Sequence, residues 1–146
     1  MHPVTSQEIN FPDLSSGELP LIVDEGNGVL KVLRHQEPVW LNGQVVELIM
    51  ARRQKIMGVV LGYQVENDLE RKQHLNSRHA NWLLANQDKI PVDWQPYRIF
   101  FWGNLFEDAQ KMPYVRFIEH IGRHWQDGYE PLHAGLTQKC LAACAK

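Results

Sequence analysis

The chain has 146 residues, a formal net charge of −2 and 44% hydrophobic residues, as expected for a globular domain with a sizeable core. This acidic balance argues against a dedicated nucleic-acid-binding protein, because neutralising phosphates requires an excess of basic side chains. No apolar run approaches the roughly 20 residues of a membrane-spanning helix, and the N-terminus has no signal-peptide pattern, so we expect a cytoplasmic protein. Residues 1–20 are expected to form an irregular arm, because three prolines interrupt them. Residues 21–146 then form a single α+β domain.

Short β-strands are expected between residues 21 and 50. Apolar runs at 21–23 and 29–33 are separated by a Gly-Asn-Gly turn, and Asn42 and Gly43 separate two later runs at 38–41 and 44–49. An Asn-Gly pair between such runs is a strong hairpin signal, because a type I′ turn needs positive φ at both central residues. The sequence therefore predicts an N-terminal β-hairpin sheet.

One central helix is predicted at about residues 67–87. Asn67 is a suitable N-cap, and Glu70 stands at the capping-box position three residues later. With about 100° of rotation per residue, His79 falls on the apolar face of this helix and His74 on the polar face. We therefore expect His79 to be buried and His74 to be solvated.

Two further segments are assigned by propensity. Residues 51–55 favour a helix, whereas residues 56–65 contain two glycines and favour a strand. Residues 134–146 are rich in alanine and are predicted to form a short terminal helix. Cys140 and Cys144 would share one face of that helix, where their geometry does not suit a disulfide.

The C-terminal half is dominated by aromatic residues, since ten of the fourteen lie between residues 94 and 129. Residues 97–102 carry apolar side chains on both faces of the predicted strand. In a half-buried strand, apolar residues alternate with polar ones. Either a second layer covers this strand, or one of its faces is an exposed surface that binds a partner. We hypothesise the latter, with a contact surface made of Trp94, Tyr97, Phe100, Trp102 and Trp125.

Residues 114–125 fit two conformations. Tyr114, Phe117 and Ile121 would share an apolar helical stripe, yet residues 114–118 are β-branched and aromatic, which favours a strand. The residues alone leave both alternatives open.

A resemblance favours strands. Residues 85–91, Trp94 and residues 97–108 resemble a segment of small prophage-associated bacterial proteins, in which an Ala-Asn-Gln…Ile-Pro…Trp stretch leads into an apolar strand. A hairpin with a Gly-Gly-x-Trp turn follows in that family, and residues 122–125 would take its place here. Asn104 stands where the family tends to have threonine, and the family's later tryptophan-rich strands are missing. The resemblance implies an aromatic β-meander and a prophage or mobile-element origin, and it implies no activity.

Two pairs of residues are candidates for a metal site. His120 and His124 are four residues apart, as are Cys140 and Cys144, so two helices could present four zinc ligands. Strand conformation at 114–125 would separate the histidines, and the spacing between the pairs matches no common zinc module. We therefore predict no metal and no cofactor, and we keep a metal-dependent hydrolase as an alternative.

The remaining alternative is a nucleic-acid-binding regulator. Its candidate contact residues are Arg52, Arg53, Lys55, Arg71 and Lys72. Trp82 could stack on a base beside them. The sequence contains no nucleotide-binding or hydrolase motif. It therefore predicts a small non-catalytic cytoplasmic protein that binds a protein partner, with inhibition of a host protein as the sharper form of this hypothesis.

Overall fold

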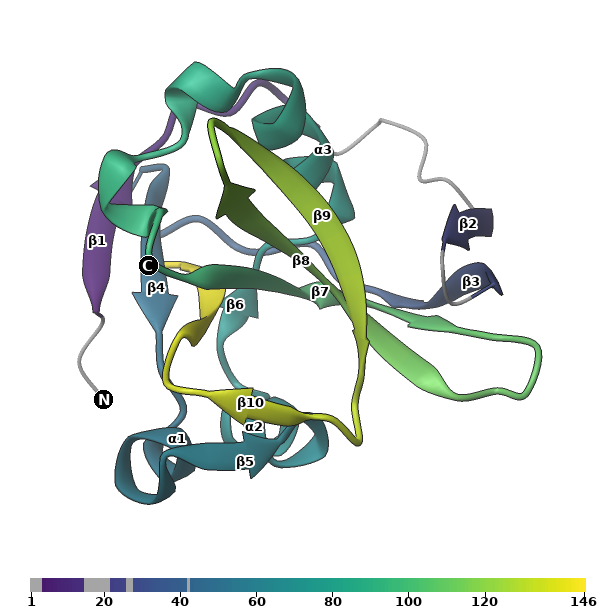
Figure 1. Ribbon diagram of the computed structural model, residues 1–146. Helices are drawn as coiled ribbons and strands as arrows, with labels where there is room; N and C mark the ends of the chain where they lie inside the picture. The colour runs from purple at the N-terminus through teal and green to yellow at the C-terminus, as the bar shows by residue number, and fades with distance from the viewer. Residues whose placement is uncertain (1–3, 15–21, 26–27, 42) are drawn as a thin grey trace.

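The computed structural model describes residues 4–14, 22–25, 28–41 and 43–146, which form an α+β fold with mostly β-structure (Figure 1). The strands are β1 (Thr5–Glu8), β2 (Ile22–Glu25), β3 (Gly28–His35), β4 (Val45–Ile49), β5 (Val59–Leu61), β6 (Gln73–His74), β7 (Arg98–Glu107), β8 (Pro113–Ile121), β9 (His124–Pro131), β10 (Gly135–Thr137) and β11 (Cys140–Ala145). The helices are α1 (Arg52–Met57), α2 (Gly62–Asp68) and α3 (Ser77–Ala85), with the 3-10 turns η1 (Gln87–Lys89) and η2 (Val92–Trp94). Among the described residues, no helix combines the length and apolar character needed to cross a membrane.

Strand β7 organises the main sheet. β8 pairs along one edge of β7, and β9 pairs with β8, so these three consecutive strands are antiparallel. The other edge of β7 is shared, because β11 pairs in parallel with its first residues and β3 pairs antiparallel with its last. The strand order β1-β4-β11-β7-β3-β2 completes the sheet, and the segment expected to be irregular thus contributes β1.

Layers cover both faces of this sheet. Ile99 and Phe101 of β7 belong to one apolar cluster with Leu83 of α3, whereas Phe100 and Trp102 belong to a second cluster with Val65 of α2. α3 lies on one side of the sheet, and α1, β5 and α2 lie at the other end of the molecule (Figure 1). Because a layer covers each face of the sheet, residues 97–102 are apolar on both faces of the strand.

The terminal helix predicted at 134–146 is wrong, because this segment forms β10 and β11. All six residues of β11 are buried between β4 and β7. Cys140, Ala142 and Cys144 face the second cluster, and Leu141 and Ala143 face the first. Alanine's helix propensity is worth less than about 1 kcal/mol per residue, which the buried sheet contacts outweigh. Small side chains suit a strand with layers packed on both of its faces.

The predicted helix at 67–87 is wrong in its first half. α2 ends at Asp68, the chain then forms β6, and α3 begins only after Asn76. Asn76 caps α3, because its side chain accepts the N–H of Arg78 while its own N–H donates to Nδ1 of His79. Leu69 packs in the second cluster and Leu75 in the first, so a single straight helix cannot bury both.

The Asn-Gly hairpin is not formed by the described residues. Residues 38–41 contain no strand, and β4 pairs with β1 and β11 instead. Asn42 itself lies outside the described residues, as do 26–27 between the antiparallel strands β2 and β3. Between residues 51 and 65, the helix α1 extends to Met57, beyond the predicted 51–55. The strand predicted at 56–65 is limited to β5, which pairs with β10 in a separate two-stranded sheet.

Gly103 is required where β7 passes the segment before α3. A Cβ at this position would lie 2.7 Å from the carbonyl oxygen of Leu75 and 2.9 Å from that of His74. These are backbone atoms, so Gly103→Ala is expected to lower the free energy of unfolding by roughly 3 kcal/mol. Gly135→Ala is the control, because a Cβ there would meet only a side-chain carbon of Val59, at 3.0 Å, and it should cost only about 1 kcal/mol. Urea unfolding measures both, and equal costs would contradict the close approach.

Candidate functional site

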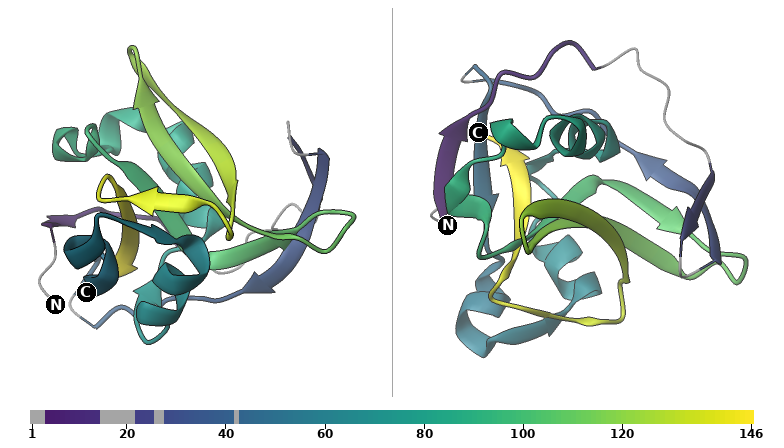
Figure 2. Two further views of the ribbon diagram at one scale, coloured as in Figure 1. Left: turned by 60° about the horizontal axis from the view of Figure 1, so that its bottom comes forward. Right: turned by 45° about the horizontal axis from the view of Figure 1, so that its top comes forward.

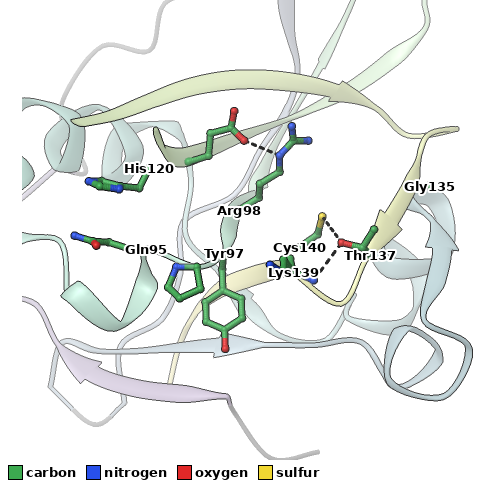
Figure 3. A pocket seen from close by; sticks show the side chains of 10 residues that line it. Gln95, Tyr97, Arg98, His120, Gly135, Thr137, Lys139 and Cys140 are labelled. Atoms are coloured by element: carbon green, nitrogen blue, oxygen red, sulfur yellow. Dashed lines mark hydrogen bonds and ion pairs between the residues drawn. The ribbon is translucent and has the colours of Figure 1, made fainter. Parts of the chain in front are cut away.

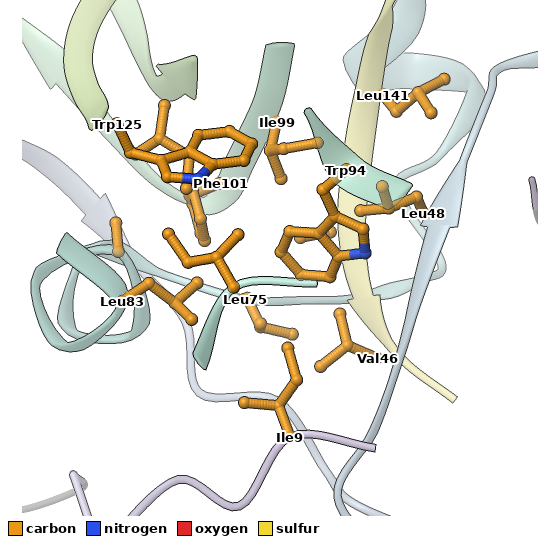
Figure 4. Close-up of a cluster of buried hydrophobic side chains, with 14 of the residues drawn as sticks. Ile9, Val46, Leu48, Leu75, Leu83, Trp94, Ile99, Phe101, Trp125 and Leu141 are labelled. Carbon is orange, nitrogen blue, oxygen red and sulfur yellow. The ribbon is translucent and has the colours of Figure 1, made fainter. Parts of the chain in front are cut away.

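The five residues predicted to form the contact surface lie in or against the core, which corrects that prediction. Trp94, Phe100, Trp102 and Trp125 are at most 5% exposed, and Tyr97 is half-buried. Figure 4 shows Trp94 and Trp125 inside the first apolar cluster. Phe100 and Trp102 stack on the opposite face of β7, with ring centroids 6.1 Å apart. These aromatic side chains therefore stabilise the fold instead of presenting a surface.

A cavity of about 300 Å³ lies where β7 and β11 begin and β8 ends (Figure 3). Arg98 is its central charged group. The guanidinium donates to Glu119 at 2.7 Å and to Glu130 at 2.8 Å, and it lies 4.6 Å from the ring centroid of Phe117. Burial opposes the positive charge, but the hydrogen bonds and charges of the two glutamates outweigh it and raise the pKa of Arg98.

The thiol that lines this cavity is not activated. Cys140 lines it, but burial raises the pKa of the thiol, so the thiol stays protonated at neutral pH. Arg98 already pairs with two carboxylates from β8 and β9, so its charge is compensated. The arrangement is an ion-pair network that joins three strands.

His74 and Cys144 form the second group with unusual chemistry. Nε2 of His74 lies 2.7 Å from the carbonyl oxygen of Leu69, and Nδ1 lies 3.4 Å from the Cys144 sulfur. Burial lowers the pKa of His74 to about 4 and raises that of Cys144, so both are neutral at pH 7. The prediction of a solvated His74 is therefore wrong. Cys144 is fully buried, which leaves no room for a substrate at the sulfur.

The candidate metal ligands do not converge. His120 and His124 lie on opposite sides of the turn between β8 and β9, where His120 pairs with Trp125. Cys140 and Cys144 lie in the buried strand β11. Among the described residues, no group of three or more histidine, cysteine, aspartate or glutamate side chains could hold a metal ion.

The basic residues proposed for nucleic-acid contact do not assemble with Trp82. Arg53 is paired with Asp68 at 3.0 Å, whereas Arg52 and Lys55 are exposed on α1. Arg71 and Lys72 are exposed in the turn after α2. Trp82 packs on Phe11 from α3, at the other end of the molecule (Figure 1). A continuous stacking platform with a basic groove is therefore missing from the described structure.

The most prominent feature of the described surface is apolar. Five large side chains within eight residues are exposed by 46% to 72%, and we call them the α1–β5 surface. Its members are Ile56, Met57, Val59, Leu61 and Tyr63. They come from the layer formed by α1, β5 and α2, which lies at the edge of the molecule in both views of Figure 2.

Sequence reasoning missed the α1–β5 surface. The available signal was the conflict between helix and strand at residues 56–65, where Gly58 and Gly62 break an apolar run. A helix ends at Gly58, which has φ +82, and another helix begins at Gly62. The short strand between them turns Val60 inward and the side chains of Val59 and Leu61 outward.

Comparison with protein-family models, curated proteins and solved structures finds no match to this chain.

Proposed function

We propose that this protein binds another protein through the α1–β5 surface. The observation that carries the proposal is the exposure of five large apolar side chains between Ile56 and Tyr63. Exposed apolar side chains scattered singly are common, whereas five within eight residues of one layer favour a site of protein contact. Origin on a prophage or other mobile element, and inhibition of a host protein, extend this proposal and are supported by the sequence resemblance alone.

The framework beneath the α1–β5 surface supports a preformed site. The buried side chain of Gln54 accepts the N–H of Ala51 and donates to the carbonyl oxygens of Thr137 and Cys140. These hydrogen bonds tie α1 to the turn between β10 and β11. Gly62 lies against the backbone of residue 132, where a Cβ would meet the carbonyl oxygen at 2.8 Å. A site held in this way loses little conformational entropy on binding.

Side chains, not strand pairing, would make the contact. β5 is a short strand whose pairing to β10 occupies one edge. The N–H of Leu61 is already accepted by the side chain of Gln64 at 3.0 Å. A partner strand therefore finds few backbone groups on β5 with which to pair.

The charges around the α1–β5 surface indicate the kind of partner. Arg52 and Lys55 are exposed on α1 beside Ile56 and Met57, and neither forms an ion pair with the described residues. Two uncompensated positive charges at the rim of an apolar patch favour a partner whose own patch is bordered by carboxylates. We therefore propose a partner with an apolar contact region and an acidic rim.

Charge insertion tests the proposal. Met57→Glu and Leu61→Glu place a carboxylate at side chains that are 67% and 46% exposed, so the fold should persist while affinity for the partner falls by roughly 100-fold, which is about 3 kcal/mol. Val92→Glu is the matched control, because Val92 is 72% exposed on η2, on the other layer. The measurement is quantitative capture from lysate with and without nuclease treatment, followed by titration of the captured protein.

The outcomes separate the alternatives. Binding of one protein that both surface variants lose and Val92→Glu retains would support the proposal, and Arg52→Glu should weaken the same complex. Capture that is equal for all variants would contradict it. A captured partner that proves to be nucleic acid, lost on nuclease treatment and steeply salt-dependent, would favour the regulator alternative instead.

A further inference from the structure

A second cavity, of about 370 Å³, lies on the opposite layer, next to the start of α3. Its walls come from segments far apart in the sequence: Phe11 and Asp13 after β1, Glu37 and Trp40 after β3, and His79 of α3. None of these residues belongs to the α1–β5 surface or to the Arg98 cavity. A cavity of this size is within the range of sites for small molecules or single side chains.

Aromatic rings make up one wall of this cavity. The rings of Phe11 and Trp40 have centroids 6.1 Å apart, and the ring of His79 lies 5.0 Å from Phe11 and 6.0 Å from Trp40. The ring of Trp82 also packs edge-on against Phe11, with centroids 5.2 Å apart. Trp40 is only half-buried, so part of its ring remains accessible. The faces of such rings carry partial negative charge and attract cations.

His79 contributes a neutral ring to this wall. Burial lowers its pKa to about 4. Its Nδ1 accepts the N–H of Asn76, which fixes the ring at the start of α3. The ring therefore adds no positive charge that would repel a cation at neutral pH.

Two charged side chains line the cavity, and both are acidic. They are Asp13 and Glu37, and among the residues that the structure describes no lysine or arginine lines it. Oε1 of Glu37 lies 2.7 Å from Nη1 of Arg78 and 2.7 Å from Nε2 of His35, so the carboxylate is held in place at the rim. Arg78 offsets part of this charge, and Asp13 adds a second carboxylate. Aromatic rings combined with carboxylates favour a cation with an apolar surface.

We propose that the cavity lined by Phe11, Trp40, Glu37 and His79 binds an organic ammonium group. This group is a trimethylammonium, which can come from a free small molecule such as choline or from a trimethylated lysine side chain in a peptide, and both present the same cation to the cavity. A metal ion does not fit this description, because among the described residues no group of three or more histidine, cysteine, aspartate or glutamate side chains could hold one. The site is independent of the proposed protein contact at the α1–β5 surface.

Isothermal titration calorimetry with choline and with its uncharged isostere 3,3-dimethylbutan-1-ol tests the charge requirement. The two compounds have nearly the same shape, so a site that uses cation–π attraction should bind choline at least about tenfold more tightly. An acetylated and amidated trimethyl-lysine is titrated in parallel. Tighter binding of choline identifies a free small molecule as the source, and tighter binding of the lysine derivative identifies a peptide.

Variants locate the site. Trp40→Leu should abolish choline binding, Trp40→Phe should restore part of it, and Glu37→Gln should weaken it by about tenfold. Circular dichroism and thermal unfolding check that each variant is folded, and Val92→Glu, at a side chain 72% exposed outside this cavity, should bind choline as the wild type does. Equal affinity for choline and its isostere, absence of choline binding, or unchanged binding by folded Trp40→Leu would each overturn the proposal.

Discussion

Replacing Trp102 with alanine is expected to lower the free energy of unfolding by about 3–5 kcal/mol, which is enough to unfold a domain of ordinary stability. The indole is 1% exposed and stacks on Phe100 between the central sheet and the α2 layer. Truncation would leave a cavity that close-packed neighbours cannot fill. Urea unfolding followed by circular dichroism measures the loss, and Trp125→Ala should behave in the same way from the other cluster.

The control for Trp102→Ala is the same substitution at an exposed apolar residue. Ile56 is 72% exposed, so Ile56→Ala should change the free energy of unfolding by no more than about 0.5 kcal/mol. If Trp102→Ala were as stable as Ile56→Ala and had lost partner binding, Trp102 would belong to a contact surface after all. That result would restore the hypothesis drawn from the aromatic density of the sequence.

Acidification is expected to destabilise this protein below about pH 6.5, because two buried histidines must stay neutral in the fold. Burial lowers the pKa of His74 and of His79 to about 4, from a usual value near 6.5. Between these values the unfolded chain binds more protons than the folded chain, so stability rises with pH in this window and is lost as the pH falls. Each histidine contributes about 3 kcal/mol to this loss, which levels off below about pH 4.

Unfolding free energies between about pH 7 and about pH 5 check this expectation, since most carboxylates stay ionised there. The slope of the unfolding free energy against pH should approach about 2.7 kcal/mol per pH unit near pH 5, because the unfolded chain there binds two more protons than the folded chain. His79→Asn should halve the slope, because the asparagine oxygen can still accept the N–H of Asn76 without titrating. A slope that His79→Asn leaves unchanged would contradict the assignment.

Local chemistry in the sequence was informative where neighbours in the chain decide the structure. The burial of His79 could be predicted from its position among the apolar residues of α3, and it is 4% exposed. The β-branched and aromatic residues at 114–118 favour a strand, and they lie in β8. The α+β class with a large share of β-structure also follows from such segments.

The aromatic pattern of β7 was open to two explanations, and only its neighbours decide between them. Residues 99–106 are all buried. α3 and η2 cover one face of the first part of β7 and α2 covers the other, whereas Phe106 packs with Leu30 and Tyr129 in a third cluster. A sequence pattern indicates how much apolar surface must be covered, but it does not identify the covering layer. The predicted partner surface failed for this reason, since the protein itself covers those rings.

The apolar content, the near-neutral charge, the α+β class and the residue types that must be buried can all be inferred from the amino-acid sequence. The central strand at residues 140–145, the N-cap of α3 at Asn76 and the exposed apolar side chains at 56–63 become clear only in the folded protein. These outcomes depend on contacts between segments that are distant in the sequence. Pairing with β4 and β7 outweighs the helix propensity of alanine in β11, and α1 and β5 expose side chains because their other faces are already packed.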